Sequence, residues 1–123
     1  MDNNLVGCLT EYTFATECLK RGYNVSFPLL DSSIYDCIVD TGDRLIKVQV
    51  KSTAKKPEGY RKSVQCRIAN NKAAYDIDKV DFFAVWVDLY SGFFIFKNKG
   101  SMQTIRLSIY GDHKEYFNNF AFD

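Results

Sequence analysis

The 123-residue sequence lacks the features that mark several classes of protein. No apolar run is long enough to cross a bilayer and no signal-peptide pattern opens the chain, so we expect a cytoplasmic protein. The four cysteines contain no CxxC pair, which disfavours a zinc site and predicts buried free thiols in a reducing compartment. Internal repeats and low-complexity segments are also absent.

Aromatic and apolar residues, by contrast, are plentiful. They make up 15% and 46% of the chain, which suits a single domain, residues 1–123, with one core rich in large side chains. The formal net charge is +1, so the overall balance argues neither for nor against a nucleic-acid partner.

The stretch YDCIVDTGDRLIKVQVKST organises the chain and predicts two strands joined by a tight turn. The first strand is expected over Tyr35–Thr41, which is rich in β-branched and aromatic residues, and the second over Arg44–Ser52. In the second strand apolar and polar residues alternate, which is the pattern of a strand with one buried face. Gly42-Asp43 fits a two-residue hairpin loop.

A two-residue loop fixes the register of this hairpin. Thr41 then opposes Arg44 and Asp36 opposes Gln49, and opposed Cβ atoms lie roughly 4.5–5.5 Å apart. Lys51 lies two residues beyond Gln49 and therefore points to the same face. The sequence thus predicts that a carboxylate, an amide oxygen and an ammonium converge on one patch, whereas a longer turn would shift the pairing.

These three groups suit phosphodiester chemistry. A carboxylate and a second oxygen are the ligands that Mg²⁺ prefers, and this ion usually keeps several waters. A bound Mg²⁺ can activate a water and neutralise the charge of a phosphate. A neighbouring lysine can orient or deprotonate the attacking water, or stabilise the charged transition state. Asp36, Gln49 and Lys51 are therefore the candidate site residues.

The same residues carry a resemblance to a known superfamily. Tyr35-Asp36 followed by Gln49-Val50-Lys51 resembles the motif of the PD-(D/E)XK endonucleases, with Gln49 in place of the second acid. The segments GCLTEYTFATECLKRGYNVSFP and VDFFAVWVDLYSGFFIFK extend the resemblance over roughly residues 7–107. The chain is most similar to the branch of small intron-encoded homing endonucleases, whose motif carries Gln in this place, and more distantly to archaeal Holliday-junction resolvases. The resemblance implies a restriction-endonuclease-like core.

The resemblance also implies roles for individual residues. Asp36, Gln49 and the Val50 carbonyl would bind Mg²⁺, for which Mn²⁺ can substitute, and Lys51 would position the nucleophilic water. Glu11 fits a G-x-x-x-E pattern on the first helix, from which a glutamate reaches toward the metal directly or through a water. Without the resemblance, Glu11 would be taken for a surface charge. Gln49 supplies an oxygen but no charge, which disfavours a second ion unless Glu11 compensates.

A basic segment begins at the first residue of the second predicted strand and extends well beyond it. From Arg44 to Lys72 the sequence has nine basic residues and one acid, a local net charge of +8 that leaves −7 for the rest of the chain. A basic surface beside a metal site is what a phosphate backbone requires, although the same residues would also suit a solvated loop. The candidate DNA contacts are Ser52, Thr53, Lys55, Lys56, Arg61, Lys62 and Arg67.

The remaining elements are predicted from periodicity and turn residues. A first helix should be capped by Asn3 or Asn4 and end near Lys20. Further strands are expected over Tyr23–Pro28, Ser63–Ile68, Val80–Leu89 and Phe93–Lys97. The predicted fold is α/β (α+β), with a mixed, largely antiparallel central sheet flanked by helices. The aromatic C-terminal tail should pack on the core or form a subunit contact.

Three functions remain open at this point. The first is a Mg²⁺-dependent endonuclease that cuts double-stranded DNA, of the site-specific homing type. The second is a nuclease that resolves branched DNA, and the third is a non-catalytic DNA-binding protein that kept the fold, which Gln49 favours. Either nuclease needs two cuts and one 123-residue subunit has little surface, so we expect a homodimer or homotetramer that associates with the nucleoid.

Overall fold

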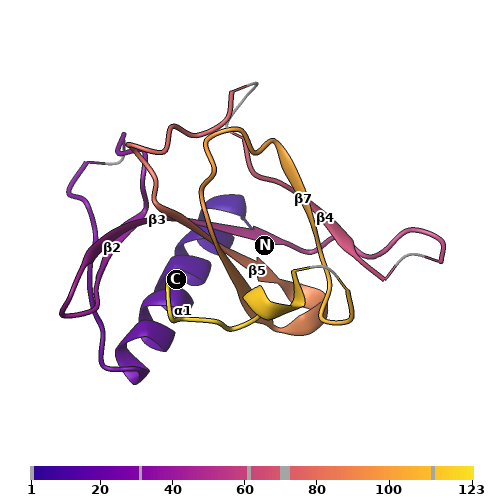
Figure 1. Ribbon diagram of the computed structural model, residues 1–123, viewed down its shortest axis with the longest axis horizontal. Coiled ribbons are helices and arrows are strands. Elements are labelled where there is room, and N and C mark those ends of the chain that lie inside the picture. Colours follow the sequence, from indigo (N-terminus) through magenta and orange to yellow (C-terminus); the bar gives the residue numbers. More distant parts are fainter. Residues whose placement is uncertain (1, 31, 61, 70–72, 112) are drawn as a thin grey trace.

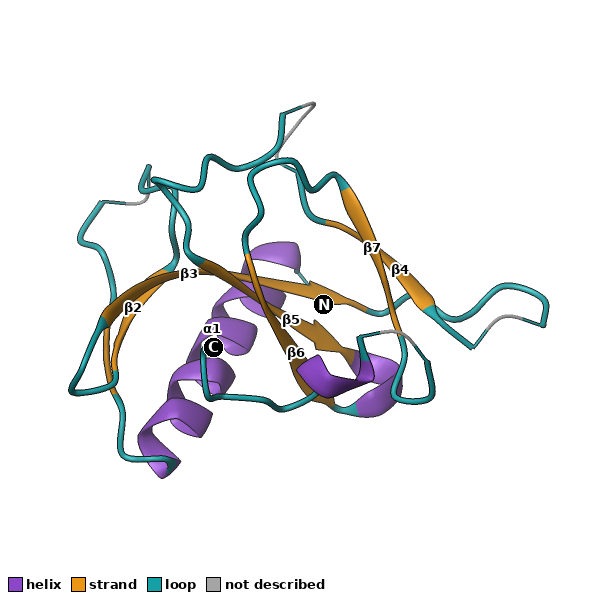
Figure 2. Cartoon of the chain, in the orientation of Figure 1, coloured by secondary structure: helices purple, strands orange, loops and turns teal. Residues whose placement is uncertain are grey.

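The computed structural model describes residues 2–30, 32–60, 62–69, 73–111 and 113–123 (Figures 1 and 2). The helices are α1 (Asn3–Lys20) and two short 3₁₀ helices, η1 (Asp88–Tyr90) and η2 (Lys114–Tyr116). The strands are β1 (Asn24–Ser26), β2 (Cys37–Asp40), β3 (Leu45–Thr53), β4 (Val64–Arg67), β5 (Phe82–Val87), β6 (Gly92–Lys97) and β7 (Thr104–Leu107). Among the residues described, no helix combines the length and the apolar character that a bilayer crossing needs.

Five strands form a central sheet in the order β1-β2-β3-β5-β6. β3 and β5 run parallel and the other neighbours are antiparallel, which confirms the mixed, largely antiparallel sheet of an α+β protein. β4 and β7 pair in a separate two-stranded sheet, seen at the right of Figure 2. A parallel pair requires a crossover connection, and here the crossover from β3 to β5 contains β4.

The hairpin of β2 and β3 has the register that the sequence predicts. Cys37 pairs with Val48, and the Thr41 N–H donates to the Arg44 carbonyl at 3.1 Å. The loop is therefore Gly42-Asp43, and its glycine has a φ of 95°, in the left-handed region that glycine tolerates without strain.

One face of the central sheet is covered by α1 and by the C-terminal tail. Phe14 and Cys18 of α1 are fully buried in a cluster with apolar residues of β2, β3, β5 and β6. Phe120 and Phe122 of the tail belong to the same cluster, with 4% and 1% of their surface exposed. Packing of the tail on the core is thus confirmed.

The small sheet of β4 and β7 covers the opposite face. Val64 of β4 and Leu107 of β7 are fully buried against Phe83 and Val85 of β5. The alternate residues of β5, such as Phe82, belong to the cluster under α1, so this central strand is buried on both faces. In the described residues, helical cover by α1 is therefore confined to the first face.

The N-terminus of α1 differs from the expectation. Asp2, rather than Asn3 or Asn4, is the N-cap, and its Oδ1 accepts a hydrogen bond from the Asn4 N–H at 2.7 Å. A carboxylate here satisfies a free N–H and interacts favourably with the positive end of the helix dipole. The C-terminus agrees with the prediction, because α1 ends at Lys20 and Gly22 has a φ of 84°.

Candidate active site

The regular pairing of β2 with β3 is interrupted at Asp36, and this interruption shapes the candidate site. The Asp36 N–H donates to the Val48 carbonyl at 2.9 Å, although Val48 is already the ladder partner of Cys37. Two consecutive residues thus face one residue of the other strand, as in a β-bulge, which redirects side chains. The predicted direct pairing of Asp36 with Gln49 is replaced by this one-residue offset.

The Asp36 carboxylate bridges the two strands. Its Oδ2 accepts a hydrogen bond from the Val50 N–H at 2.8 Å. Burial raises the pKa of Asp36, while the Val50 N–H and the charge of Lys51 oppose this rise because they favour the ionised carboxylate. Asp36 is therefore anchored at the middle residue of the Gln49-Val50-Lys51 motif.

Gln49 presents a buried amide oxygen without a hydrogen-bond donor. Its Oε1 is the one buried side-chain nitrogen or oxygen in the described part of the chain that has no hydrogen-bond partner. An unpaired buried acceptor costs about 1–3 kcal/mol, so such an atom calls for a physical explanation. An amide oxygen of this kind is a suitable ligand for a hard divalent cation.

Lys51 lies on the same face of β3 as Gln49, as predicted from the alternation along the strand. Its Nζ is 5.3 Å from the centroid of the Tyr75 ring, within the range of a cation–π interaction. Burial lowers the pKa of Lys51 and the charge of Arg67 lowers it further, whereas the charge of Asp36 opposes the change. The ammonium therefore lies beside an aromatic ring and within electrostatic reach of the Asp36 carboxylate.

Glu11 approaches the same carboxylate from α1. Glu11 and Asp36 line one cavity of about 190 Å³, together with Ser33 and Tyr35 from the loop before β2. Burial raises the pKa of Glu11, and the charge of Asp36 raises it further. Two carboxyls within electrostatic reach repel each other when both are ionised, and a cation between them would remove that repulsion.

A metal ion at this site would need ligands besides the two carboxylates. The described residues contain no group of three or more His, Cys, Asp and Glu side chains that could hold a metal ion. A cation beside Asp36 and Glu11 would therefore also need the Gln49 amide and main-chain oxygens. Oxygen ligands of both kinds are usual for Mg²⁺, which completes its shell with water.

The predicted DNA contacts lie at the end of β3, in the segment that connects it to β4, and at the end of β4. The exposed members are Ser52, Lys55, Lys56, Lys62 and Arg67, and Thr53 is half-buried. The segment between β3 and β4 extends away from the body of the molecule at the right of Figure 1. Arg67 lies close enough to Lys51 for its charge to affect the lysine pKa. Arg61 lies outside the described residues.

Two residues of this region were not predicted from the sequence. Arg106 of β7 lines a cavity of about 320 Å³ together with Lys55 and Lys56, and its guanidinium donates to the Gln65 Oε1 at 3.4 Å. Tyr75, from the loop before β5, covers the candidate lysine. No local sequence pattern marks Arg106 as part of this surface. It reaches the surface only through the pairing of β4 with β7, which sets it opposite Gln65.

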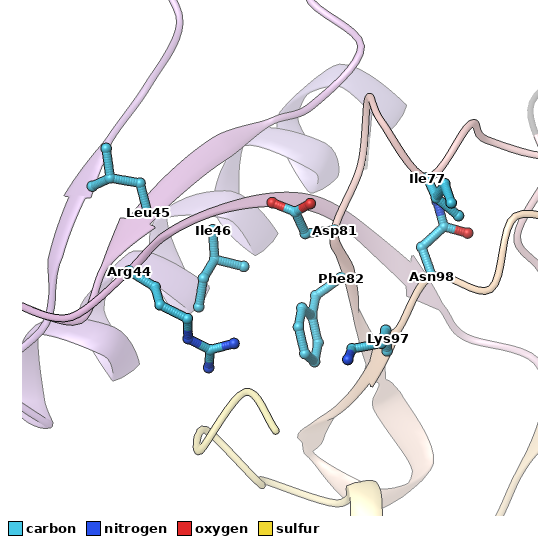
Figure 3. Close-up of a pocket in the computed structure, with 8 residues that line it drawn as sticks. All are labelled: Arg44, Leu45, Ile46, Ile77, Asp81, Phe82, Lys97 and Asn98. Atoms are coloured by element: carbon cyan, nitrogen blue, oxygen red, sulfur yellow. The ribbon is translucent and has the colours of Figure 1, made fainter.

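A larger cavity, of about 590 Å³, lies near the other end of β3 (Figure 3). Arg44, Phe82 and Lys97 line it, and their side chains point toward the same space in the figure. Lys51 is six residues beyond Leu45, which also lines this cavity, or roughly 20 Å along the strand. We therefore place the candidate site at the smaller cavity, which contains the carboxylates.

Comparisons with known proteins identify the family and the fold of this chain. A family model described as PD-(D/E)XK endonuclease matches residues 1–121. A bacterial homing endonuclease, I-Ssp6803I, has a similar structure, with a TM-score of 0.75 and 22% identity over 95% of this chain and 87% of that chain. Hjc of Archaeoglobus fulgidus, a Holliday junction resolvase, gives a TM-score of 0.55 and 11% identity over 83% of each chain. At these identities the two structures show the fold alone. A comparison with curated protein sequences finds no match.

Proposed function

This chain belongs to the PD-(D/E)XK endonuclease family, and from that premise we propose that it is a Mg²⁺-dependent, site-specific endonuclease of the homing type that hydrolyses phosphodiester bonds of double-stranded DNA. The observation that carries the proposal is the buried Gln49 Oε1, which has no donor. It lies in the motif that also supplies Lys51 and the Val50 N–H bound by the Asp36 carboxylate.

The residues present fit a hard divalent cation. Asp36, Gln49 and the Val50 carbonyl would hold Mg²⁺, for which Mn²⁺ can substitute, and Glu11 would contribute directly or through a water. The bound ion would supply Lewis-acid stabilisation of phosphate charge and a more acidic water. The unpaired Gln49 Oε1 and the shared cavity of Glu11 and Asp36 support this assignment.

The chain itself orients the reactants. Lys51 has a pKa lowered by burial, so its amine exchanges a proton more readily than an exposed lysine does. It can therefore hold the attacking water or donate a hydrogen bond to a phosphate oxygen. Tyr75 restricts the lysine on one side and Asp36 attracts it from another. The products would be a 5′-phosphate and a 3′-hydroxyl, as the family resemblance implies.

The partner would be DNA held by the exposed basic surface between β3 and β7. Lys55, Lys56 and Arg106 surround one cavity there, and Arg67 lies near the candidate lysine. Cationic side chains on such a surface bind phosphates regardless of sequence. A second subunit would supply the second cut, and the protein would act where DNA lies, in the nucleoid of the cytoplasm.

Plasmid cleavage with and without Mg²⁺ tests the proposed activity. Asp36→Asn and Lys51→Ala should each lower the cleavage rate by roughly a hundredfold or more, because each removes a group to which the proposal gives a role at the reacting phosphate. The matched controls are Asp40→Asn, at the far end of β2 from Asp36, and the exposed Lys99→Ala, and both should cut like the wild type. Comparable cleavage by all five proteins would refute the site.

The neutral residue at position 49 supports a second candidate function. A protein that kept the fold and lost catalysis would bind DNA and leave it intact with every divalent ion. A four-way junction digested beside linear duplex separates the remaining alternatives. Preferential cutting of the junction would assign a resolvase, and binding without any cleavage would assign the non-catalytic role.

A further inference from the structure

The outer face of the small sheet carries polar and basic side chains. In β4 and β7 the residues that alternate with the buried ones are exposed, among them Gln65, Arg67 and Arg106. Lys55 and Lys56 lie beside Arg106, because all three residues line the cavity of about 320 Å³. Alternation along the two strands therefore gathers cations on the surface that faces away from the central sheet.

These cations form a track that ends beside the candidate site. Arg67 is near enough to Lys51 for its charge to lower the pKa of that lysine. Lys62 lies five residues before Arg67, at most about 18 Å along an extended chain. In the described part of the chain, ion pairs within 4.0 Å form only at Glu17 of α1, and Glu58 lines the same cavity without making one. We call this surface the basic track, and its members are Lys55, Lys56, Lys62, Arg67 and Arg106.

An exposed aromatic ring lies at the Lys62 end of the basic track. The Lys62 Nζ is 5.6 Å from the centroid of the Tyr110 ring, within the range of a cation–π interaction. Tyr110 is nevertheless 68% exposed, so the lysine leaves much of the ring uncovered. A cation that can bind a phosphate and an aromatic surface that is open to solvent are therefore neighbours here.

Contacts with the core hold both Tyr110 and Lys62 in place. The Tyr110 ring meets the Tyr90 ring edge-on at 6.4 Å, and Tyr90 in turn meets the fully buried Phe94 at 6.1 Å. The Tyr90 hydroxyl donates a hydrogen bond to the Lys62 carbonyl at 2.7 Å. The Tyr110 N–H donates to the hydroxyl of the buried Ser108 at 3.0 Å. The ring and the lysine are thus positioned before a ligand arrives, which limits the entropy lost on binding.

A line of cations with an exposed aromatic ring beside it is the combination that binds single-stranded nucleic acid. The cations bind successive phosphates, and the ring stacks on a base whatever the identity of that base. In an intact duplex the bases are already stacked on one another, so the ring adds little to the binding of paired DNA. An unpaired base has a free face, and stacking on it adds to the attraction between the cations and the phosphates.

We propose that Tyr110 stacks on an unpaired base of DNA whose backbone follows the basic track, with Lys62 on the adjoining phosphate. The inference deepens the proposed function, and its biological setting rests on that function. It makes unpaired nucleotides beside the cleavage position part of the substrate, as in DNA that is branched, nicked or locally melted. The stacking itself requires neither a metal ion nor cleavage, so it is measurable on its own.

Tyr110→Leu is the sharpest test, because it removes the aromatic face and preserves both an apolar side chain and the net charge. Tyr110→Phe retains the face and is the conservative variant. Tyr12→Leu makes the same change at another exposed tyrosine, on α1 across the central sheet from the basic track, and is the matched control. Lys62→Ala removes the cation above the ring and leaves the ring itself.

Fluorescence anisotropy in chelator measures binding to an oligothymidylate of about 12 nucleotides, to the same strand paired with its complement, and to a strand of equal length without bases. Tyr110→Leu should bind the oligothymidylate at least about fivefold more weakly than the wild type, whereas Tyr110→Phe and Tyr12→Leu should bind it equally well. On the duplex and on the strand without bases, Tyr110→Leu should differ from the wild type by less than about twofold, which also shows that it is folded. Its slope of log affinity against log salt should be unchanged, while that of Lys62→Ala should fall by roughly 0.7.

Equal affinities of Tyr110→Leu and the wild type for the oligothymidylate would overturn the proposal. An equal loss on all three ligands would do the same, because the tyrosine would then act on the backbone and not on a base. Neither outcome depends on cleavage. A protein that stacks a base and cuts no DNA would preserve this inference and refute the nuclease, and a nuclease whose Tyr110→Leu variant binds like the wild type would do the reverse.

Discussion

At the scale of single residues, Gln49 sets the chemistry of the candidate site apart from that of a motif with two acids. An amide contributes an oxygen ligand without adding a charge beside Asp36 and Glu11. The site thereby avoids a third mutually repelling carboxylate, at the expense of electrostatic attraction for a cation. The unpaired Gln49 Oε1 shows where that weaker ligand points, namely into buried space that provides no hydrogen-bond donor.

Gln49→Glu tests this balance through stability rather than activity. In chelator the new carboxylate is buried near Asp36, so the free energy of unfolding should fall by about 1–3 kcal/mol relative to the wild type. Excess Mg²⁺ should restore the melting temperature, and its stabilising effect should exceed that on the wild type because the added charge strengthens binding. Thermal unfolding with and without Mg²⁺ measures both effects.

The exposed Gln103→Glu is the control for that measurement, since its charge lies away from the site. It should melt like the wild type under both conditions. Equal responses of the two glutamate variants to Mg²⁺ would show that position 49 is not a metal ligand.

At the scale of elements, local patterns predict the hairpin of β2 and β3 because its register depends only on a two-residue turn. The same patterns misplace the α1 cap, where Asp2 competes with two nearby asparagines that are equally good caps in isolation. The bulge at Asp36 was beyond local reasoning as well. There the Val50 N–H donates to the Asp36 carboxylate rather than to a main-chain carbonyl, which alternation along a strand does not reveal.

The C-terminal tail behaves as an element of the core, although residues 113–123 form no strand or α-helix. Phe122 is 1% exposed, its ring lies 5.3 Å from that of Phe82, and its carbonyl accepts a hydrogen bond from the Arg44 guanidinium. Phe122→Ala should therefore lower the free energy of unfolding by about 3–5 kcal/mol, measured by urea denaturation. Tyr60→Ala, at a fully exposed aromatic, should change it by less than about 0.5 kcal/mol. Equal unfolding midpoints for the two variants would mean that the tail is not part of the core.

At the scale of the whole molecule, the sequence predicts candidate residues for the site but not which distant segments lie beside them. Asp36, Gln49 and Lys51 belong to one hairpin and could be placed by strand alternation. Tyr75 reaches Lys51 only because β5 lies parallel to β3, and Asn98 holds the loop by donating to the Tyr75 and Val80 carbonyls at 3.1 and 2.9 Å. Contacts of this kind depend on topology, which no local pattern encodes.

The basic surface is also a property of the whole fold, because Arg106 joins Lys55 and Lys56 only through the pairing of β4 with β7. Arg106→Ala should weaken binding to duplex DNA in chelator uniformly across sequences. If the arginine contacts one phosphate, the slope of log affinity against log salt should fall by roughly 0.9. Fluorescence anisotropy titrations at several salt concentrations measure this slope, with Lys99→Ala as the exposed control. An unchanged slope in Arg106→Ala, or an equal fall in the control, would remove this face from the DNA interface, because a phosphate contact must release counterions where it forms.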